Sequence, residues 1–257
     1  MGKVPDTQMA ERLLDTFTSE VGKAEIAVLM PIHNEAEAIE ESVNEFYDAV
    51  GSRMPLEFVL SEDGSTDDTE NVIERLSEKI PLKAILSTSR KGYAGGIKDG
   101  LKLVKAKYVL ITDSDGQHDP RDFWKIWNLR TEYDIVSGWR KKRADSLYRR
   151  VMSQVFQLRI KSAFNLPNLM DITAPFKLMK TEVAIEIAEK CKYMSESFWN
   201  EFLVRAHVSG FSIGETPVSH RIRADKSATR VYKPWKIPKI ALAQLIALSK
   251  LKSELNM

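Results

Sequence analysis

The sequence predicts an α/β fold in which a mostly parallel sheet is flanked by helices. Three observations carry this prediction. Short apolar runs alternate with helical patterns from residue 24 to residue 138, the connections between them are short, and a polar cluster follows most of the apolar runs. Such alternation is typical of parallel strands joined by crossover helices.

Composition limits the class of protein. Of 257 residues, 43% are hydrophobic and 29% are charged, which is usual for a chain with a packed core. Lys and Arg number 38 against 36 Asp and Glu, so a net charge of +2 gives no electrostatic reason to expect nucleic acid as a partner. The single cysteine, Cys191, excludes a disulfide framework and a multi-cysteine metal site, and it fits a reducing compartment.

The sequence contains no clear membrane or secretion signal. No stretch reaches the roughly 18 uncharged apolar residues of a membrane span, and the first 15 residues lack the apolar region of a secretory signal. We therefore expect a cytoplasmic protein, either free or resting on a membrane surface.

The elements of the first half follow from periodicity. Residues 7–20 have the pattern of a short amphipathic helix. Residues 35–50 are predicted to be helical because Ile39, Val43, Phe46 and Val50 form one apolar stripe. Continuous apolar runs suit strands that are buried on both faces; these are 24–31, 56–60, 82–87, 107–112 and 133–138. Helices are expected at 67–80, at 94–106 and after Pro120.

The second half is less regular. We expect a long helix at 145–165, strands at 173–180 and 211–219, and helices at 181–190 and 196–209. A basic loop follows at 221–233. An amphipathic helix at 236–255, which has basic flanks and Trp235 near its start, ends the chain. Such a helix either lies in a membrane interface or packs on the sheet or on a partner.

Four polar clusters follow strand ends: PIHNE, SEDGSTDD, STSRKGYAGG and DSDGQHDP. Ligands of parallel sheets bind beyond the carboxyl ends of the strands. The clusters therefore predict one shared site at one edge of the sheet.

The cluster at 113–120 has the chemistry of a metal site. Asp113, Asp115 and Gln117 offer hard oxygen ligands that suit Mg²⁺ or Mn²⁺. The alternative is a solvated acidic turn. His118 fits a hydrogen-bonding role behind the ligands better than ligation.

Two other clusters have features of a nucleotide site. Asp63 can accept hydrogen bonds from a base or a ribose, although a turn with a helix cap explains Gly64 to Asp67 equally well. Arg90 and Lys91 precede glycines that open a helix, where backbone N–H groups can face phosphate. The segment matches neither a P-loop nor a dinucleotide fingerprint.

Five motifs in order carry a family resemblance: MPIHNE (30–35), SEDGSTDDT (61–69), RKGYAGGIKDGLK (90–102), TDSDGQHDP (112–120) and SGWR (137–140). Together they resemble glycosyltransferase family 2, which has the GT-A fold. Gln117 and His118 resemble the dolichyl- and polyprenyl-phosphate mannose synthase branch. The resemblance covers about residues 24–233, and DITAPFK (171–177) resembles another family stretch, with Pro175 where glycine is usual.

The resemblance implies a set of site residues. The nucleotide-sugar donor would contact Pro31, His33, Glu35, Ser61, Asp63, Lys91, Asp113 and Ser114. The metal, Mg²⁺ or Mn²⁺, would be held by Asp113, Asp115 and Gln117. The catalytic group would include Asp115, Arg140 and Arg223, with Arg221 and Arg230 as rivals of Arg223 for the phosphate contact.

The resemblance also implies an organisation and an activity. A GT-A domain would span 1–233, with a nucleotide-sugar half at 24–140 and an acceptor half at 141–233, and the C-terminal helix would occupy 234–257. The leading hypothesis is an inverting, metal-dependent hexosyltransferase that moves a sugar from an NDP-sugar (GDP-mannose or a UDP-sugar) to a polyprenyl or dolichyl phosphate. Any membrane contact would be peripheral, or through a membrane partner.

Other hypotheses remain open. The acceptor can instead be a saccharide or another small molecule. A sugar hydroxyl acceptor would need a general base, and Glu201 is then the candidate. A surface carboxylate on an amphipathic helix is the better interpretation of Glu201. A processive polysaccharide synthase is disfavoured because a Gln-x-x-Arg-Trp motif is missing. A nucleotidyltransferase is disfavoured because PIHNE replaces its glycine-rich opening. A nucleotide-binding module without activity is the remaining alternative.

Overall fold

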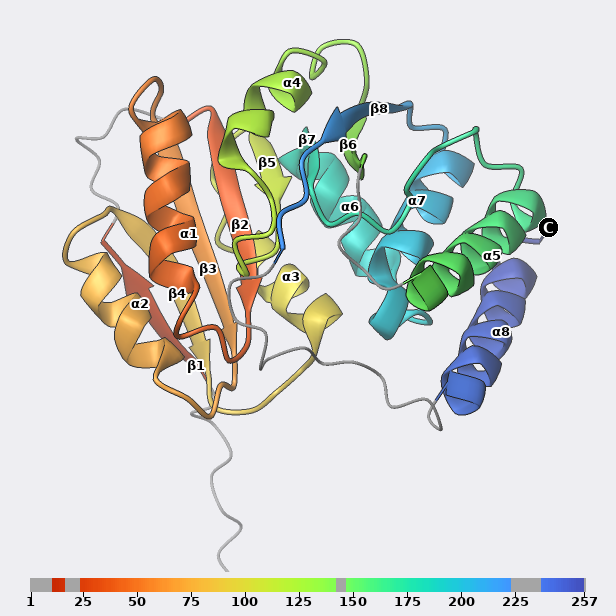
Figure 1. Ribbon diagram of the computed structural model, residues 1–257, viewed down its shortest axis with the longest axis horizontal. Coiled ribbons are helices and arrows are strands. Elements are labelled where there is room, and N and C mark those ends of the chain that lie inside the picture. The colour runs from red at the N-terminus through yellow and green to blue at the C-terminus, as the bar shows by residue number, and fades with distance from the viewer. Residues whose placement is uncertain (1–10, 17–23, 142–146, 223–236, 257) are drawn as a thin grey trace, which may run out of the picture.

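One eight-stranded sheet runs through the middle of the protein (Figure 1). The computed structural model describes residues 11–16, 24–141, 147–222 and 237–256. The strand order is β1-β4-β3-β2-β5-β7-β6-β8. The strands are β1 (Glu11–Asp15), β2 (Ile26–Ile32), β3 (Leu56–Asp63), β4 (Leu82–Ser87), β5 (Tyr108–Ile111), β6 (Ile135–Arg140), β7 (Lys177–Lys180) and β8 (Ile213–Val218).

Parallel pairing dominates the sheet, as predicted. The strands β4, β3, β2 and β5 are parallel neighbours, and β6 pairs in parallel with β8. By contrast, β7 runs antiparallel to both β5 and β6, and β1 runs antiparallel to β4. The fold class expected from the sequence is therefore confirmed, with two reversed strands added.

Helices cover both faces of the sheet, because the central strands bury both sets of their side chains. In β2, Val28 and Met30 contribute to the apolar core on one face, and Ala27 and Leu29 to the core on the other. The first face is covered by α1 (Ile39–Phe46), α2 (Thr69–Ser77) and α4 (Phe123–Trp127). The second is covered by α3 (Tyr93–Leu101), α5 (Leu147–Ala163), α6 (Thr181–Lys190), α7 (Phe198–Val208) and α8 (Ile237–Glu254). The apolar stripe predicted for residues 35–50 is confirmed, since Ile39, Val43 and Phe46 of α1 are buried, as is Val50 in the π-helical turn Tyr47–Gly51 that follows.

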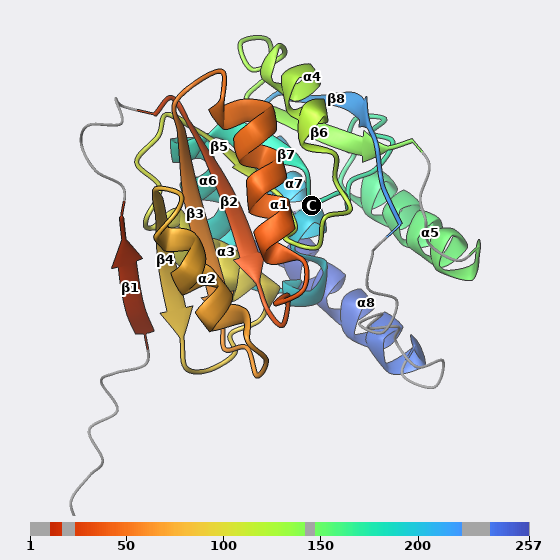
Figure 2. The ribbon, with the colours of Figure 1, turned by 60° about the vertical axis from the view of Figure 1, so that its left-hand side comes forward.

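The prediction of a helix at 7–20 is wrong for the residues that the structure describes there. Residues 11–15 form β1, which lies alone beside β4 (Figure 2). Its register runs from Glu11 opposite Ser87 to Asp15 opposite Lys83. An exposed strand edge carries unpaired backbone N–H and C=O groups, so pairing with β4 outweighs the local helical pattern. Arg12 adds ion pairs to Glu70 and Glu74 of α2.

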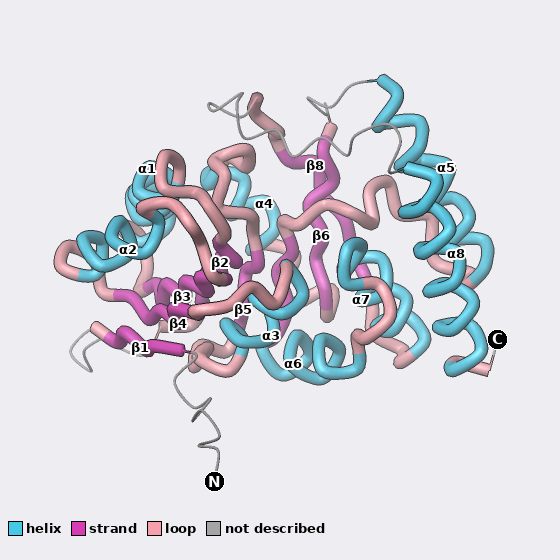
Figure 3. Tube along the Cα trace, turned by 90° about the horizontal axis from the view of Figure 1, so that it is seen from below, coloured by secondary structure: helices cyan, strands magenta, loops and turns pink. Residues whose placement is uncertain are grey.

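The C-terminal helix α8 packs on the domain and also exposes apolar side chains. Leu251 is fully buried, and Gln244 Nε2 donates a hydrogen bond to Ser197 Oγ at 2.8 Å. Glu254 pairs with Arg205 at 3.1 Å and with Lys192 at 3.0 Å. The exposed apolar side chains are Leu242, Leu245 and Ile246. Figures 1 and 3 both show α8 at the opposite end of the molecule from β1. No described helix is long and apolar enough to cross a bilayer.

Candidate functional site

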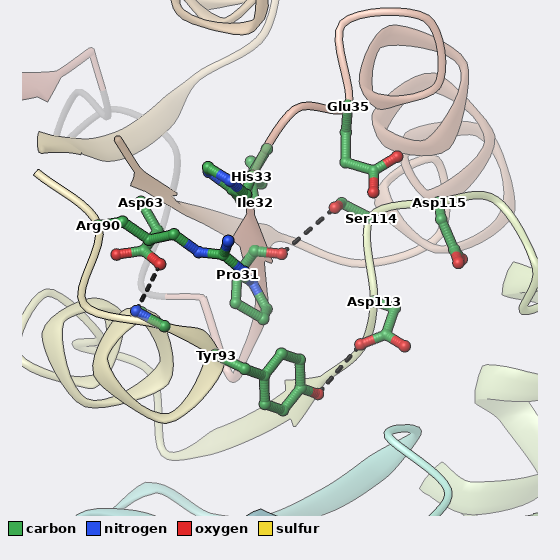
Figure 4. Close-up of a pocket in the computed structure, with 12 residues that line it drawn as sticks. Pro31, Ile32, His33, Glu35, Asp63, Arg90, Tyr93, Asp113, Ser114 and Asp115 are labelled. Atoms are coloured by element: carbon green, nitrogen blue, oxygen red, sulfur yellow. Dashed lines mark hydrogen bonds between the residues drawn. The ribbon is translucent and has the colours of Figure 1, made fainter. Parts of the chain in front are cut away.

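A pocket lies at the carboxyl ends of β2, β3 and β5, where the sequence predicts a shared site (Figure 4). The first turn of α3 forms another wall. The pocket is lined by Pro31, Ile32, His33, Glu35, Asp63, Arg90, Gly92, Tyr93, Gly96, Asp113, Ser114 and Asp115. Seven of the residues expected in the site are therefore brought together: Pro31, His33, Glu35, Asp63, Asp113, Ser114 and Asp115.

The first two polar clusters are held together by hydrogen bonds. Asn34 has a φ of 55°, and its backbone N–H donates to Ser65 Oγ at 2.8 Å. The Asn34 side chain accepts a hydrogen bond from the Thr66 N–H at 2.7 Å, and the Glu35 N–H donates to Thr69 Oγ1 at 2.9 Å. The left-handed backbone at Asn34 turns the chain after β2, which holds His33 and Glu35 on the pocket wall.

Asp63 ends β3 and clamps the loop that follows β4. One carboxylate oxygen accepts the Lys91 N–H at 2.6 Å, and the other accepts the Gly92 N–H at 2.7 Å. Gly92 has a φ of 83°, which glycine adopts without strain, and it begins α3. Both carboxylate oxygens of Asp63 thus already accept hydrogen bonds from the backbone, and the residue also lines the pocket.

The structure places Arg90, rather than Lys91, on the pocket wall. Lys91 forms ion pairs with Glu11 of β1 and Asp99 of α3, which fixes its ammonium outside the lining of the pocket. Lys91 is therefore an expected site residue that the structure does not place among the lining residues. Ser61 also stays outside the lining: it is 1% exposed and lies beneath Gly96, where an added Cβ would be 3.7 Å from its Oγ.

Asp113 and Asp115 bring two carboxylates to one loop. Burial raises the pKa of Asp113 to about 7, and the charge of Asp115 adds to that rise. Between them, Ser114 Oγ donates to the Pro31 carbonyl at 3.2 Å, and the Ser114 carbonyl accepts from Ser42 Oγ at 3.0 Å. These two bonds fix the loop to β2 and α1, so both carboxylates are held near the pocket.

These residues fit a divalent cation. A carboxylate such as that of Asp113, whose ionisation is penalised by burial and by a neighbouring carboxylate, is stabilised by a nearby positive charge. Gln117 Nε2 donates to the Arg221 carbonyl at 3.1 Å, so the side-chain oxygen of Gln117 is the atom that could serve as a ligand. The described residues contain no group of three or more His, Cys, Asp or Glu side chains arranged for a metal. Mg²⁺ usually takes one or two carboxylates together with substrate phosphates, and this donor set matches that pattern.

Arg140 lies outside the lining residues and is held by two side chains of the segment before β7. Its guanidinium pairs with Asp171 at 2.7 Å and donates to Thr173 Oγ1 at 2.7 Å. Its positive charge lowers the pKa of Asp113, against the larger increases caused by burial and by the charge of Asp115. Arg223 and Arg230 lie outside the described residues. Arg221 pairs with Glu45 at 2.7 Å and Asp119 at 3.2 Å, so acidic side chains of the protein already bind its guanidinium.

Glu201 is neither a base in the pocket nor a surface carboxylate. It is 1% exposed and pairs with Arg205 at 2.8 Å. Its oxygens also accept the backbone N–H groups of residues 192, 193 and 194. Sequence periodicity could not show this, because the partners come from the loop before α7.

Histidine and tyrosine complete the surroundings. His118 is 4% exposed and stacks on Phe176, and burial lowers its pKa to about 3. Its Nδ1 has no hydrogen-bond partner among the described residues, so the expected hydrogen-bonding role is not seen for that atom. Tyr93 lines the pocket and donates to Asp113 Oδ1 at 3.0 Å; burial raises its pKa well above 10. Neither Tyr93 nor Arg90 is predicted from the sequence as a donor contact, although both line the pocket and belong to one motif, RKGYAGGIKDGLK.

Comparison with known proteins supplies the family. The family model described as Glycosyl transferase family 2 matches residues 27–188. Glycosyltransferase AglD of Haloferax volcanii is 29% identical over 212 residues, which is 78% of this chain and 34% of AglD. Undecaprenyl-phosphate 4-deoxy-4-formamido-L-arabinose transferase of Pseudomonas syringae pv. syringae is 26% identical over 141 residues, which is 53% of this chain and 42% of that protein. The chain thus spans well under half the length of these curated relatives.

Solved structures show the same GT-A fold. The mannosyltransferase PcManGT from Pyrobaculum calidifontis, in complex with GDP-Man and Mn²⁺, has a TM-score of 0.62 at 21% identity, covering 89% of this chain and 64% of that one. Glucosyl-3-phosphoglycerate synthase from Mycobacterium tuberculosis, in complex with Mn²⁺, UDP and phosphoglyceric acid, has a TM-score of 0.63 at 15% identity, covering 91% of this chain and 79% of that one. Because the family model matches well over half of the sequence, the chain belongs to glycosyl transferase family 2.

Proposed function

We propose that this chain is an inverting hexosyltransferase that moves a sugar from GDP-mannose or a UDP-sugar to a polyprenyl or dolichyl phosphate, with Mg²⁺ or Mn²⁺ as cofactor. The observation that carries the proposal is the pocket, where Asp63 at the end of β3 meets Asp113 and Asp115, which follow β5. The structural relatives that hold GDP-Man or UDP with Mn²⁺ support a donor of this class.

Each group has a task in sugar transfer. Asp113, Asp115 and the side-chain oxygen of Gln117 would hold the metal, which when bound stabilises the charge of the departing diphosphate. Arg90 presents a second cation to the pocket, where it can bind a phosphate oxygen. Glu35 and His33 line the same pocket and fit the nucleoside.

The acceptor half favours an anionic acceptor. A lipid phosphate is ionised at neutral pH, so it needs positioning rather than a general base. The buried state of Glu201 removes the base that a sugar hydroxyl acceptor would have used. Arg140 and Arg223 are the cations that we assign to this phosphate, with Asp171 and Thr173 holding Arg140 in place. The relative named for undecaprenyl phosphate supports this acceptor class.

A small phosphorylated acceptor is the second candidate. It is favoured by the glucosyl-3-phosphoglycerate synthase, whose structure with phosphoglyceric acid shares the fold over 91% of this chain. Both acceptors carry a phosphate, so the same arginines would serve either one. The two candidates differ in whether the enzyme needs a lipid.

A transfer assay decides between them. The full chain is incubated with radiolabelled GDP-mannose, UDP-glucose or UDP-N-acetylglucosamine and Mn²⁺, with undecaprenyl phosphate, with dolichyl phosphate, with 3-phosphoglycerate or without acceptor. We expect label in the lipid fraction for one donor. Label in 3-phosphoglycerate alone would favour the second candidate, and absence of transfer and hydrolysis with every donor would contradict both.

A further inference from the structure

A directed chain of two hydrogen bonds leads from the acceptor half to Asp113. Trp199 of α7 donates from Nε1 to the Tyr93 hydroxyl at 2.9 Å. Tyr93, in the first turn of α3, donates to Asp113 Oδ1 at 3.0 Å, and Figure 4 shows this second bond. Three segments that are far apart in the sequence therefore meet at one carboxylate.

The direction of the chain is fixed by chemistry. An indole N–H can only donate, so the Tyr93 oxygen must be the acceptor of that bond. The hydroxyl has one proton, and it is directed at Asp113. A hydroxyl that donates to one oxygen of a carboxylate restricts the orientation of that carboxylate.

The surroundings hold the chain rigid. Trp199 is 5% exposed and contacts Phe198 and Phe202, with ring centroids 5.1 and 5.3 Å apart. The ammonium of Lys177, which is fully buried, lies 5.3 Å from the Trp199 ring centroid. The indole therefore has little freedom to turn, and it fixes the hydroxyl that it contacts.

We propose that Tyr93 and Trp199 are positioning residues, which hold the Asp113 carboxylate by its Oδ1 so that Oδ2 is presented to the metal and the donor diphosphate. This inference rests on the proposed function, because it assigns the pair to the donor site of a transferase. Bonds behind a metal ligand fix its orientation and raise its affinity for the metal. Here they also connect that ligand to α7 in the acceptor half.

The test uses three variants of the full chain: Tyr93→Phe, Trp199→Phe and the double variant. Mn²⁺ binding is measured by electron paramagnetic resonance with GDP or UDP present. We expect Tyr93→Phe to weaken Mn²⁺ binding roughly 10-fold or more, the scale seen when partners of metal ligands are removed. Trp199→Phe should weaken it less, and it should add nothing in the Tyr93→Phe background, because the indole acts only through the hydroxyl. In the transfer assay, saturating Mn²⁺ should restore the rate of Tyr93→Phe.

Matched controls separate positioning from packing. Tyr108→Phe and Trp127→Phe alter a buried aromatic pair near the start of β5, with ring centroids 5.4 Å apart, and should leave Mn²⁺ affinity unchanged. An NMR measurement without ligand follows the Trp199 indole N–H, which should exchange faster in Tyr93→Phe. Equal Mn²⁺ affinity in folded Tyr93→Phe, or additive losses in the double variant, would overturn the positioning role and leave the proposed function standing. Wild-type protein that binds no Mn²⁺–nucleotide would reject the proposed function and this role with it.

Discussion

Asp63 connects the sheet to the loop that forms one wall of the pocket. Because its two oxygens hold the N–H groups of Lys91 and Gly92, we expect Asp63→Ala to release that loop and with it Arg90. The affinity for GDP or UDP should fall by about 1–3 kcal/mol, the scale for losing a charged hydrogen-bond partner. Calorimetry measures this, with the exposed Asp68→Ala as control. Unchanged affinity in a folded variant would contradict the prediction.

Lys177 is a buried lysine whose titration should affect stability. Burial lowers its pKa from 10.5 to about 7, against the opposing charges of Asp171 and Glu215. Above pH 7 the unfolded chain therefore binds more protons at this site than the folded one, so its contribution to the free energy of unfolding rises with pH until about 10.5.

Thermal denaturation between pH 6 and 9.5 tests this effect. Relative to Lys177→Met, the wild type should gain stability above pH 7, by at most about 1.4 kcal/mol per pH unit. The exposed Lys190→Met should follow the wild type. Parallel pH profiles of wild type and Lys177→Met would show that Lys177 stays charged in the folded state.

The sequence identifies the residues that surround the pocket better than the partners that hold them. Asp63, Asp113 and Asp115 follow strand ends, so topology alone brings them together. The ion pairs of Lys91 and Arg140 could not be predicted, because Glu11 and Asp171 are distant in sequence and become neighbours only when the sheet has formed.

At the level of elements, local pattern and tertiary pairing disagree in two places. The residues of β1 have a helical pattern but pair with the edge of β4, because backbone hydrogen bonds across a strand edge are non-local. The reversed direction of β7 is equally invisible in its apolar residues, since burial on both faces looks the same for either direction. The central strands were predictable because burial on both faces leaves long apolar runs.

The helix α8 gives an element-scale prediction about membranes. Deleting residues 234–257 would remove the buried Leu251 and the ion pairs of Glu254, so it would destabilise the domain. Changing Leu242, Leu245 and Ile246 together to Ser leaves that packing in place. We expect this variant to bind vesicles of phosphatidylglycerol and phosphatidylcholine more weakly than the wild type, because apolar area that inserts at the interface is lost.

The control for this experiment is a change of exposed apolar residues elsewhere, Leu13→Ser with Met170→Ser. Binding of wild type should also weaken at high salt, since the charge attraction is screened. GDP or UDP affinity should be the same in all variants. Equal vesicle binding by the α8 variant and wild type would exclude α8 as the membrane contact.

At the scale of the whole molecule, ligand binding should stabilise the complete fold. The pocket takes residues from β2, β3, β5 and α3, so Mn²⁺ with GDP or UDP has to be lost before these elements separate. At 100 times the dissociation constant we expect about 2.7 kcal/mol of stabilisation, seen as a rise in melting temperature. EDTA or Asp115→Ala should remove the part that depends on metal. A rise that is identical with and without EDTA would contradict a metal-assisted donor site.

The order of strands has a consequence for protein engineering. The chain leaves β5, forms β6 two positions away, and returns as β7 to fill the gap between them. A chimera that exchanges residues 141–233 for those of a relative would therefore replace β7 in the middle of the sheet and β8 at its edge, with three new strand pairings to satisfy. Single side-chain changes around the Arg140–Asp171 ion pair would instead leave the pairings of β7 and β8 in place.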